Sequence, residues 1–462
     1  MRRLARRAGW RSTHLRARPP ERPVGAKLEL THACNLRCGF CYTDSPRHTL
    51  LRTPDLPDDT WHRIATEAAD LGVIELVLTG GEPFLRRDLV LSLLDTLAGR
   101  DVGLTLNTNG WFVDDEIADR LAEIPGLLVD ISIDGATPAL HDASRGVPGS
   151  WRRAVEAASR LLDRGVRVQV VHVVTPVNER SFDEMLEQMW TLGVTSLRAT
   201  PVVALGAAAR SGRWGVNRDR LRRSIRAFNR THGDGMRVIL QPGNAGLLAI
   251  HDHAAPVAML VRPTGAVLTD SLHPFSFGNA AEEGLQACWA RVVERWRDPK
   301  ISDWAGSLRK SSDLADAPLI PYLNDEVPVG GDGSASASHA ADPVPERAQP
   351  RDDSGDPAEN LARARDQVSS LALARRYRLG PARVGGGPDE HYVRQVESGR
   401  VVKLNATAAL MLEELSGRTA AEAVTRLSDR YEGVERERLE ADVLATGRSL
   451  VDEGILVPAT AG

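Results

Sequence analysis

The sequence has 462 residues and a formal net charge of −4, with 42% hydrophobic and 26% charged residues. This length predicts at least two domains, the composition is typical of a soluble enzyme, and the charge indicates no nucleic-acid partner. No apolar run approaches the ~18 residues of a membrane span, so we expect no membrane contact. Four cysteines, three of them close together, form no disulfide framework, which favours a reducing, cytoplasmic location.

The first segment, residues 1–25, is strongly basic and carries eight arginines. An export signal would need an apolar region after the arginines, and none follows. We therefore expect a disordered basic leader.

Residues 26–233 alternate six times between a short apolar run and a segment of helical periodicity. Nearly continuous apolar runs are typical of parallel strands buried on both faces. The pattern predicts an α/β fold, a partial (βα)6 TIM-like barrel with its helices outside. Functional residues are expected where the strands end. The predicted strands are "KLELT", "IELVLTG", "GLTLNTN", "LLVDISID", "RVQVVHVV" and "SLRATPVV".

Three cysteines, Cys34, Cys38 and Cys41, follow the first predicted strand. Thiolates this close together can ligate one metal centre. A [4Fe–4S] cluster normally takes four cysteines, so three would leave one iron with an open coordination position. The alternative is a structural zinc site, which His32 or His48 would complete as the fourth ligand.

The second predicted strand is followed by Gly80-Gly81-Glu82-Pro83. Glycines let a backbone approach a ligand closely, and the Glu82 carboxylate can accept hydrogen bonds from an ammonium group. By itself the motif is equally typical of a plain turn.

Together, "CNLRCGFC", "GGEP", "NTNG" after strand three and "SIDG" after strand four resemble the radical S-adenosylmethionine (radical SAM) enzymes over about residues 26–206. The resemblance implies one three-cysteine [4Fe–4S] cluster whose free iron chelates S-adenosylmethionine. It also implies reductive cleavage of that molecule to a 5′-deoxyadenosyl radical, which takes a hydrogen atom from the substrate. The electron would come from a flavodoxin-type donor.

Carried over residue by residue, the resemblance assigns cofactor contacts beyond the cysteines. Phe40 would touch the adenine side, and the backbone of Gly80 and Gly81 with the Glu82 carboxylate would meet the methionine amine. Ribose or carboxylate contacts fall on Asn107, Asn109 and Ser132. Arg145 would pair with the methionine carboxylate through its planar donor fork.

Residues 234–304 resemble the SPASM/twitch extension of peptide-modifying members, but the cluster cysteines of that extension are missing. We expect a small α+β cap, a remnant without auxiliary cluster. Cys288 is its one cysteine, and on a helix beside Leu285 and Trp289 such a residue is usually a buried apolar one. The alternative role is that of a hydrogen-atom donor to a substrate radical.

Residues 305–370 include a stretch rich in Gly, Ser, Ala, Pro and Asp, which predicts a flexible linker. Residues 371–458 predict a hairpin and three short helices, a winged-helix-like module. Thr419 and Glu422 form a capping-box pattern there. The segment resembles PqqD-like peptide-binding modules, also called RiPP recognition elements. The alternative is a generic winged helix that binds DNA or protein. The third predicted helix of this segment is acid-rich, which argues against DNA binding.

The combined resemblance implies an enzyme that modifies a ribosomally made precursor peptide, whose leader the C-terminal module binds by strand addition. Two other functions stay open. One is a radical SAM enzyme acting on a small molecule or cofactor precursor, with the module binding a carrier protein. The other is a non-catalytic iron–sulfur scaffold, which has no need of the residues around Gly80.

Overall fold

The structure is a computed structural model, in which the chain forms two compact units. The first comprises residues 1–330 and 383–402, and the second comprises 331–382 and 403–462. The structure describes residues 19–45, 54–212, 215–232, 235–241, 256–271, 275–299, 301, 304, 327–328, 377–379, 382–385, 391–395, 401–404, 406–430, 436–452 and 455–458.

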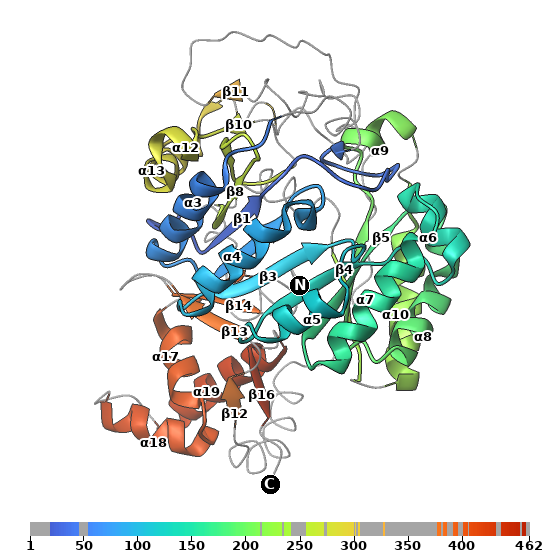
Figure 1. Ribbon diagram of the computed structural model, residues 1–462. Helices are drawn as coiled ribbons and strands as arrows, with labels where there is room; N and C mark the ends of the chain where they lie inside the picture. The colour runs from blue at the N-terminus through green and yellow to red at the C-terminus, as the bar shows by residue number, and fades with distance from the viewer. Residues whose placement is uncertain are drawn as a thin grey trace, which may run out of the picture. The chain divides into compact units, whose positions relative to one another are not determined.

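A curved parallel sheet forms the centre of the first unit (Figure 1). Its six predicted strands pair in sequence order, each parallel to the next. They are β1 (Gly25–Glu29), β2 (Glu75–Thr79), β3 (Gly103–Thr108), β4 (Leu128–Ser132), β5 (Arg167–Val174) and β6 (Ser196–Pro201). The partial-barrel prediction is confirmed.

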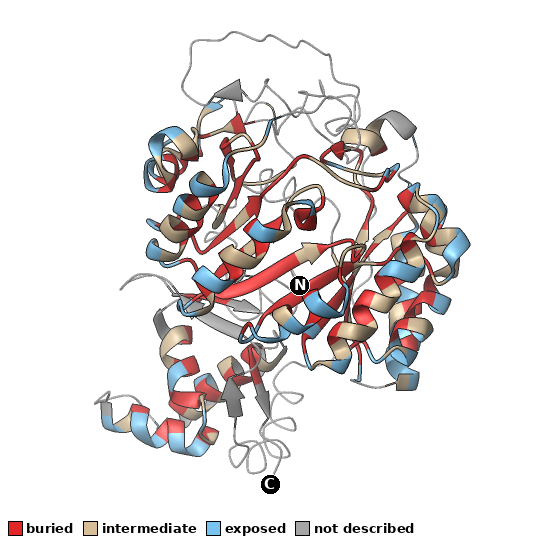
Figure 2. Ribbon diagram, in the orientation of Figure 1, coloured by how far each residue is buried: buried red, intermediate tan, exposed pale blue. Residues whose placement is uncertain are grey.

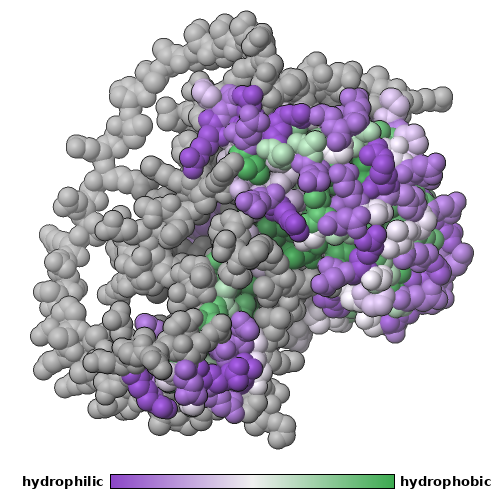
Figure 3. Space-filling view, turned by 90° about the vertical axis from the view of Figure 1, so that its left-hand side faces the viewer, coloured by the Kyte–Doolittle hydropathy of each residue, from purple (hydrophilic) through white to green (hydrophobic). Residues whose placement is uncertain are grey.

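Amphipathic helices cover the outer face of this sheet, and buried residues gather between helices and strands (Figure 2). On α7, for example, Ala154, Ala158 and Leu161 are buried one helical turn apart. The solvent side is mostly hydrophilic (Figure 3). The covering helices are α3 (Asp58–Asp70), α4 (Arg87–Ala98), α5 (Asp115–Ala122), α6 (Pro138–Arg145), α7 (Ser150–Asp163), α8 (Phe182–Thr191) and α10 (Arg218–His232), and a short α9 (Gly206–Ser211) follows β6.

The described part of residues 234–304, the segment predicted as a small cap on the barrel, extends the barrel sheet at both edges. β7 (Arg237–Leu240) pairs parallel with β6, and β8 (Ala258–Val261) pairs parallel with β1. β9 (Val267–Leu268) then pairs antiparallel with β8. A parallel edge strand exposes unpaired backbone groups, and short apolar strands such as β7 and β8 satisfy them.

The other end of this segment packs on the outside of the barrel. β10 (Phe275–Ser276) pairs with β11 (Val327–Pro328), and α12 (Ala280–Glu283) precedes α13 (Leu285–Arg295). Trp289 on α13 donates its indole N–H to the carbonyl of Pro20 at 2.9 Å.

The contact with Pro20 corrects the predicted leader. Residues 19–25 are folded, with Val24 3% exposed and Gly25 already in β1. Apolar burial and strand pairing therefore begin before the predicted boundary at residue 26. The rest of the leader, 1–18, lies outside the described residues. So does the predicted linker 305–370, apart from β11.

The C-terminal region contains the predicted hairpin and helices. β14 (His391–Gln395) lies between β13 (Ala382–Gly385) and β15 (Val401–Leu404), while β12 (Tyr377–Leu379) pairs antiparallel with β16 (Leu456–Pro458). The helices are α17 (Ala406–Leu415), α18 (Ala420–Arg430) and α19 (Arg436–Asp452). The capping box is confirmed, because Thr419 N–H donates to Glu422 and Glu422 N–H donates to Thr419 Oγ1.

Candidate functional site

The three clustered cysteines lie in the loop after β1 and line one cavity of about 500 Å³ within the curve of the sheet. Cys38 is buried, and Cys34 and Cys41 are partly buried. The loop is tied to later parts of the barrel, since Arg37 N–H donates to Arg145 O at 2.9 Å and Ala207 N–H donates to Cys41 O at 2.9 Å. The cavity therefore opens at the strand ends, where the parallel fold predicts function.

Each cysteine sulfur has a polar partner among the described residues. Leu36 N–H donates to Cys34 Sγ at 3.4 Å, Arg145 Nη1 donates to Cys38 Sγ at 3.7 Å, and Cys41 Sγ lies 3.1 Å from Thr43 Oγ1. Burial raises the pKa of Cys34 and raises that of Cys38 to about 11. A bound metal cluster would stabilise the thiolates against this desolvation, and hydrogen bonds to ligand sulfurs are one of the factors that set the potential of iron–sulfur clusters.

The zinc alternative finds no support from His32. Its Nδ1 lies 2.8 Å from Asp55 Oδ1, and His32 is not among the described residues that line the cavity with the three cysteines. His48 lies outside the described residues. No three His, Cys, Asp or Glu side chains in the described ranges converge on a single ion site. Cysteines that each ligate a different iron need no such common point.

Gly80 and Gly81 place the loop after β2 directly against the cysteine loop. Gly81 N–H donates to Thr31 O at 2.7 Å, and Glu82 N–H donates to Ala33 O at 2.8 Å. A Cβ on Gly81 would lie 2.0 Å from Ala33 O, and Gly80 has φ +149°. Both glycines line the cavity, and no other residue type fits this approach.

Glu82 is buried and holds neighbouring loops together by hydrogen bonds. It is not among the described residues that line the cavity. Its Oε1 accepts from Thr108 Oγ1 at 2.7 Å and from Phe84 N–H at 3.2 Å, and its Oε2 accepts from Asn109 N–H at 2.8 Å. Burial raises its pKa to about 7 against these hydrogen bonds. The carboxylate thus connects the loops after β2 and β3, and its predicted contact with a methionine amine stays a prediction.

The other predicted contacts do converge, because Phe40, Asn107, Asn109, Ser132 and Arg145 all line the cavity. Arg145 lies over the Phe40 ring at 5.2 Å. Its donor fork is already partly engaged, since Nε forms a 2.5 Å ion pair with Asp134 and Nη1 faces Cys38.

Cys288 does not reach the cavity. It is fully buried on α13 among the barrel's hydrophobic core, and the cavity lining of the described residues does not include it. Burial raises the pKa of its thiol to about 12. The structural role expected for a lone cysteine fits this position, and the hydrogen-donor alternative does not.

Sequence reasoning missed the polar floor of the cavity, formed by inward-facing residues of β1 to β6. Asp130 pairs with Arg198, and Thr105 donates to Glu75 at 2.7 Å. Lys27 donates to Tyr42 at 2.9 Å, and burial lowers the pKa of this lysine. The signal was present as polar residues two apart within the apolar runs, such as "KLE" and "TLN".

The comparisons with known proteins agree with this geometry. The family described as the radical SAM superfamily matches residues 28–189, and the family of coenzyme PQQ synthesis protein D (PqqD) matches residues 390–456. The mycofactocin maturase MftC of Mycobacterium tuberculosis (strain ATCC 25618 / H37Rv) is 30% identical over 303 residues, which are 62% of this chain and 75% of that protein. The chain belongs to the radical SAM superfamily.

Two other relatives match the chain over different lengths. The PqqA peptide cyclase of Rhizobium meliloti (strain 1021) is 27% identical over 351 residues, covering 71% of this chain and 88% of that protein. The pre-heme d1 synthase of Dinoroseobacter shibae (strain DSM 16493 / NCIMB 14021 / DFL 12) is 34% identical over 248 residues, covering 51% and 58%. The chain spans only about half the length of several curated relatives that it matches.

Among solved structures, Streptococcus suis SuiB bound to S-adenosylmethionine has the same fold, with a TM-score of 0.50 at 17% identity over 66% of this chain and 72% of that one. The superfamily uses a [4Fe–4S] cluster held by three cysteines together with S-adenosylmethionine. Cys34, Cys38 and Cys41 fit that cluster through their spacing and the polar partner at each sulfur.

Proposed function

We propose that this radical SAM protein modifies a ribosomally made precursor peptide whose leader binds to its PqqD-like module. One observation carries the proposal, namely that a cysteine-lined barrel cavity and a PqqD match at 390–456 occur on one chain. The PqqA peptide cyclase relative, which this chain covers at 88% of its length, supports a peptide substrate.

Cys34, Cys38 and Cys41 would hold the cluster, which would supply reductive cleavage of S-adenosylmethionine and thereby hydrogen-atom abstraction from the peptide. The chain's own residues bind and orient. Gly80 and Gly81 would contact the methionine end through their backbone, and Phe40 would contact the adenine side. Asn107, Asn109 and Ser132 would make the polar contacts between these two ends. Arg145 would supply the positive charge that pairs with the methionine carboxylate. A flavodoxin-type donor provides the electron, and the enzyme acts in the reducing cytoplasm.

The polar floor supports a polar target side chain. Asp130 is 3% exposed. Its Oδ1 and the Oδ1 of Asn107 are both buried and have no hydrogen-bond partner among the described residues. These two residues are register partners on β3 and β4, so their side chains stand side by side on the cavity face. A neutral carboxamide, whose NH2 group has two N–H donors, would satisfy both acceptors without adding a positive charge beside Arg198, and a hydroxyl would satisfy one of them.

The test uses intact enzyme and compares a full-length candidate precursor, sought among short open reading frames near the gene, with the same peptide lacking its leader. Product mass should appear with the full precursor and fall at least tenfold without the leader, because tethering through the module raises the local peptide concentration. Uncoupled formation of 5′-deoxyadenosine without peptide should be unchanged. Equal turnover of both peptides would overturn the proposal.

A second candidate function is chemistry on a small molecule or cofactor precursor, with the module binding a carrier protein. The 34% identity to a pre-heme d1 synthase favours it. It gains support if no peptide next to the gene is modified and the isolated leader shows no affinity for the enzyme.

A further inference from the structure

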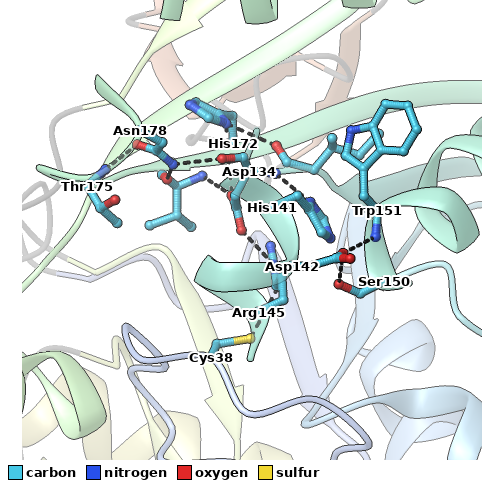
Figure 4. Close-up of polar contacts among 12 residues, drawn as sticks. Cys38, Asp134, His141, Asp142, Arg145, Ser150, Trp151, His172, Thr175 and Asn178 are labelled. Atoms are coloured by element: carbon cyan, nitrogen blue, oxygen red, sulfur yellow. Dashed lines mark hydrogen bonds and ion pairs between the residues drawn. The ribbon is translucent and has the colours of Figure 1, made fainter. Parts of the chain in front are cut away.

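Arg145 lies between the cysteine loop and a network of buried polar groups (Figure 4). It is the last residue of α6 and is 8% exposed. Its Nη1 donates to Cys38 Sγ at 3.7 Å, and its backbone carbonyl accepts from Arg37 N–H at 2.9 Å. Side chain and backbone of one residue therefore both contact the cysteine loop.

Asp134 determines where the guanidinium lies. Its side chain is fully buried, and its Oδ2 forms a 2.5 Å ion pair with Arg145 Nε. Its Oδ1 accepts from Val173 N–H at 2.7 Å, and its carbonyl accepts from Asn178 Nδ2 at 2.8 Å. Strand β5 thus binds the carboxylate of Asp134, and the loop after β5 binds its backbone carbonyl.

The two histidines of the network add no charge to this pair. His141 Nδ1 accepts from Asp134 N–H at 3.0 Å, so that nitrogen carries no proton. Burial, followed by Arg145, lowers the pKa of His141 to about 4, and burial lowers the pKa of His172, whose Nδ1 lies 3.0 Å from Ile133 O. Arg145 is therefore the cation that balances Asp134 and faces a cluster sulfur.

We propose that Arg145, oriented by Asp134, is a positioning residue that raises the reduction potential of the cluster through its N–H···S hydrogen bond to Cys38. Hydrogen bonds to ligand sulfurs and nearby positive charge stabilise the reduced cluster, which carries one more electron. A buried ion pair is weak evidence for stability alone, because desolvation offsets much of its attraction. The role of the Arg145–Asp134 pair here is to hold the Arg145 guanidinium beside Cys38 Sγ.

This role is separate from a contact with the methionine carboxylate, which needs S-adenosylmethionine. The hydrogen bond to Cys38 exists without it. A measurement on cluster-loaded protein free of S-adenosylmethionine therefore isolates the proposed effect.

The experiment is a redox titration of anaerobically reconstituted full-length protein, with dithionite supplying one electron per cluster and the reduced cluster followed by EPR. Arg145→Gln should shift the midpoint potential to more negative values, and Arg145→Lys, which keeps the charge, should lie between Gln and wild type. Arg153→Gln, which removes an exposed arginine from α7, is the control and should leave the potential unchanged. Iron content is measured for every variant before titration.

A second measurement needs no variant. Wild-type protein labelled with guanidino-¹⁵N arginine should show a ¹⁵N coupling to the reduced cluster in pulsed EPR, since Nη1 donates to a ligand sulfur. Equal midpoint potentials in wild type and Arg145→Gln, or no ¹⁵N coupling, would overturn the proposal. If only the affinity for S-adenosylmethionine falls in Arg145→Gln, Arg145 acts on the methionine carboxylate alone.

Discussion

At the scale of single residues, Glu82 shows how a motif residue serves the fold. Its carboxylate is fully buried and accepts three hydrogen bonds from Phe84, Thr108 and Asn109. Burial still raises its pKa from 4.5 to about 7, so desolvation outweighs the donors. The folded protein therefore takes up a proton at Glu82 between these two pH values.

This uptake predicts a pH-dependent stability. Between pH 4.5 and 7 the folded state binds more protons than the unfolded state, so the Glu82 contribution is greatest below 4.5 and is lost as pH rises through 7. From pH 5 to 8 the apoprotein should lose about 2 kcal/mol of unfolding free energy relative to Glu82→Gln, measured by urea unfolding. Glu184→Gln, at an exposed position of α8, is the control. A pH-independent difference between wild type and Glu82→Gln would contradict the raised pKa.

At the scale of elements, the loop after β2 and the cysteine loop form one unit. Their backbones exchange hydrogen bonds at Gly81 and Glu82, as a continuation of the β1–β2 ladder. The glycines allow this contact, because any side chain at Gly81 would overlap the backbone of Ala33, the residue before Cys34. The position of the cysteines thus depends on a neighbouring loop.

Gly81→Ala should therefore reduce cluster binding. The added Cβ would meet Ala33 O at 2.0 Å, which displaces the cysteine loop, and we expect iron well below the roughly four per chain of the wild type after anaerobic reconstitution. Gly99→Ala is the matched control, because a Cβ there meets nothing within 4 Å. Wild-type iron content in Gly81→Ala would show that the two loops are not held in contact.

At the scale of the whole molecule, the larger unit includes residues from near both ends of the chain. Residues 383–402 belong to it, and Tyr392 on β14 is 1% exposed in a small cluster with Val24 and Ile74, which precede β1 and β2. Part of the PqqD match at 390–456 therefore contributes to the core of the radical SAM unit. In the described part of the chain, no helix is both long and apolar enough to span a bilayer.

Tyr392→Ala should then destabilise the larger unit by about 3 kcal/mol, since it removes a fully buried aromatic ring. Thermal unfolding followed by circular dichroism measures the effect, with Tyr392→Phe as the control that keeps the ring. The same midpoint for Tyr392→Ala and wild type would mean that β14 does not pack against Val24 and Ile74.

Local sequence contains the motifs whose resemblance to radical SAM enzymes implies the cofactors, and it also shows the repeating units of this protein. Cys34, Cys38 and Cys41 lie within eight residues, and Gly80-Gly81 follows the next strand, so short-range spacing specifies them. The alternation of apolar and helical segments likewise indicated the partial barrel, because a strand buried on both faces reads as a nearly continuous apolar run in its own sequence.

Only the tertiary structure decided which residues meet. Arg145 and Cys38 are 107 positions apart, and Asp130 and Arg198 are 68 apart, so no local pattern links them. The curvature of the sheet brings their strands and loops around one cavity, whose inner face is polar although its strands look apolar. Cys288 and Glu82 are fully buried because distant helices and loops pack over them. Contacts between sequence-distant residues follow from sheet closure and packing, and these are properties of the whole fold.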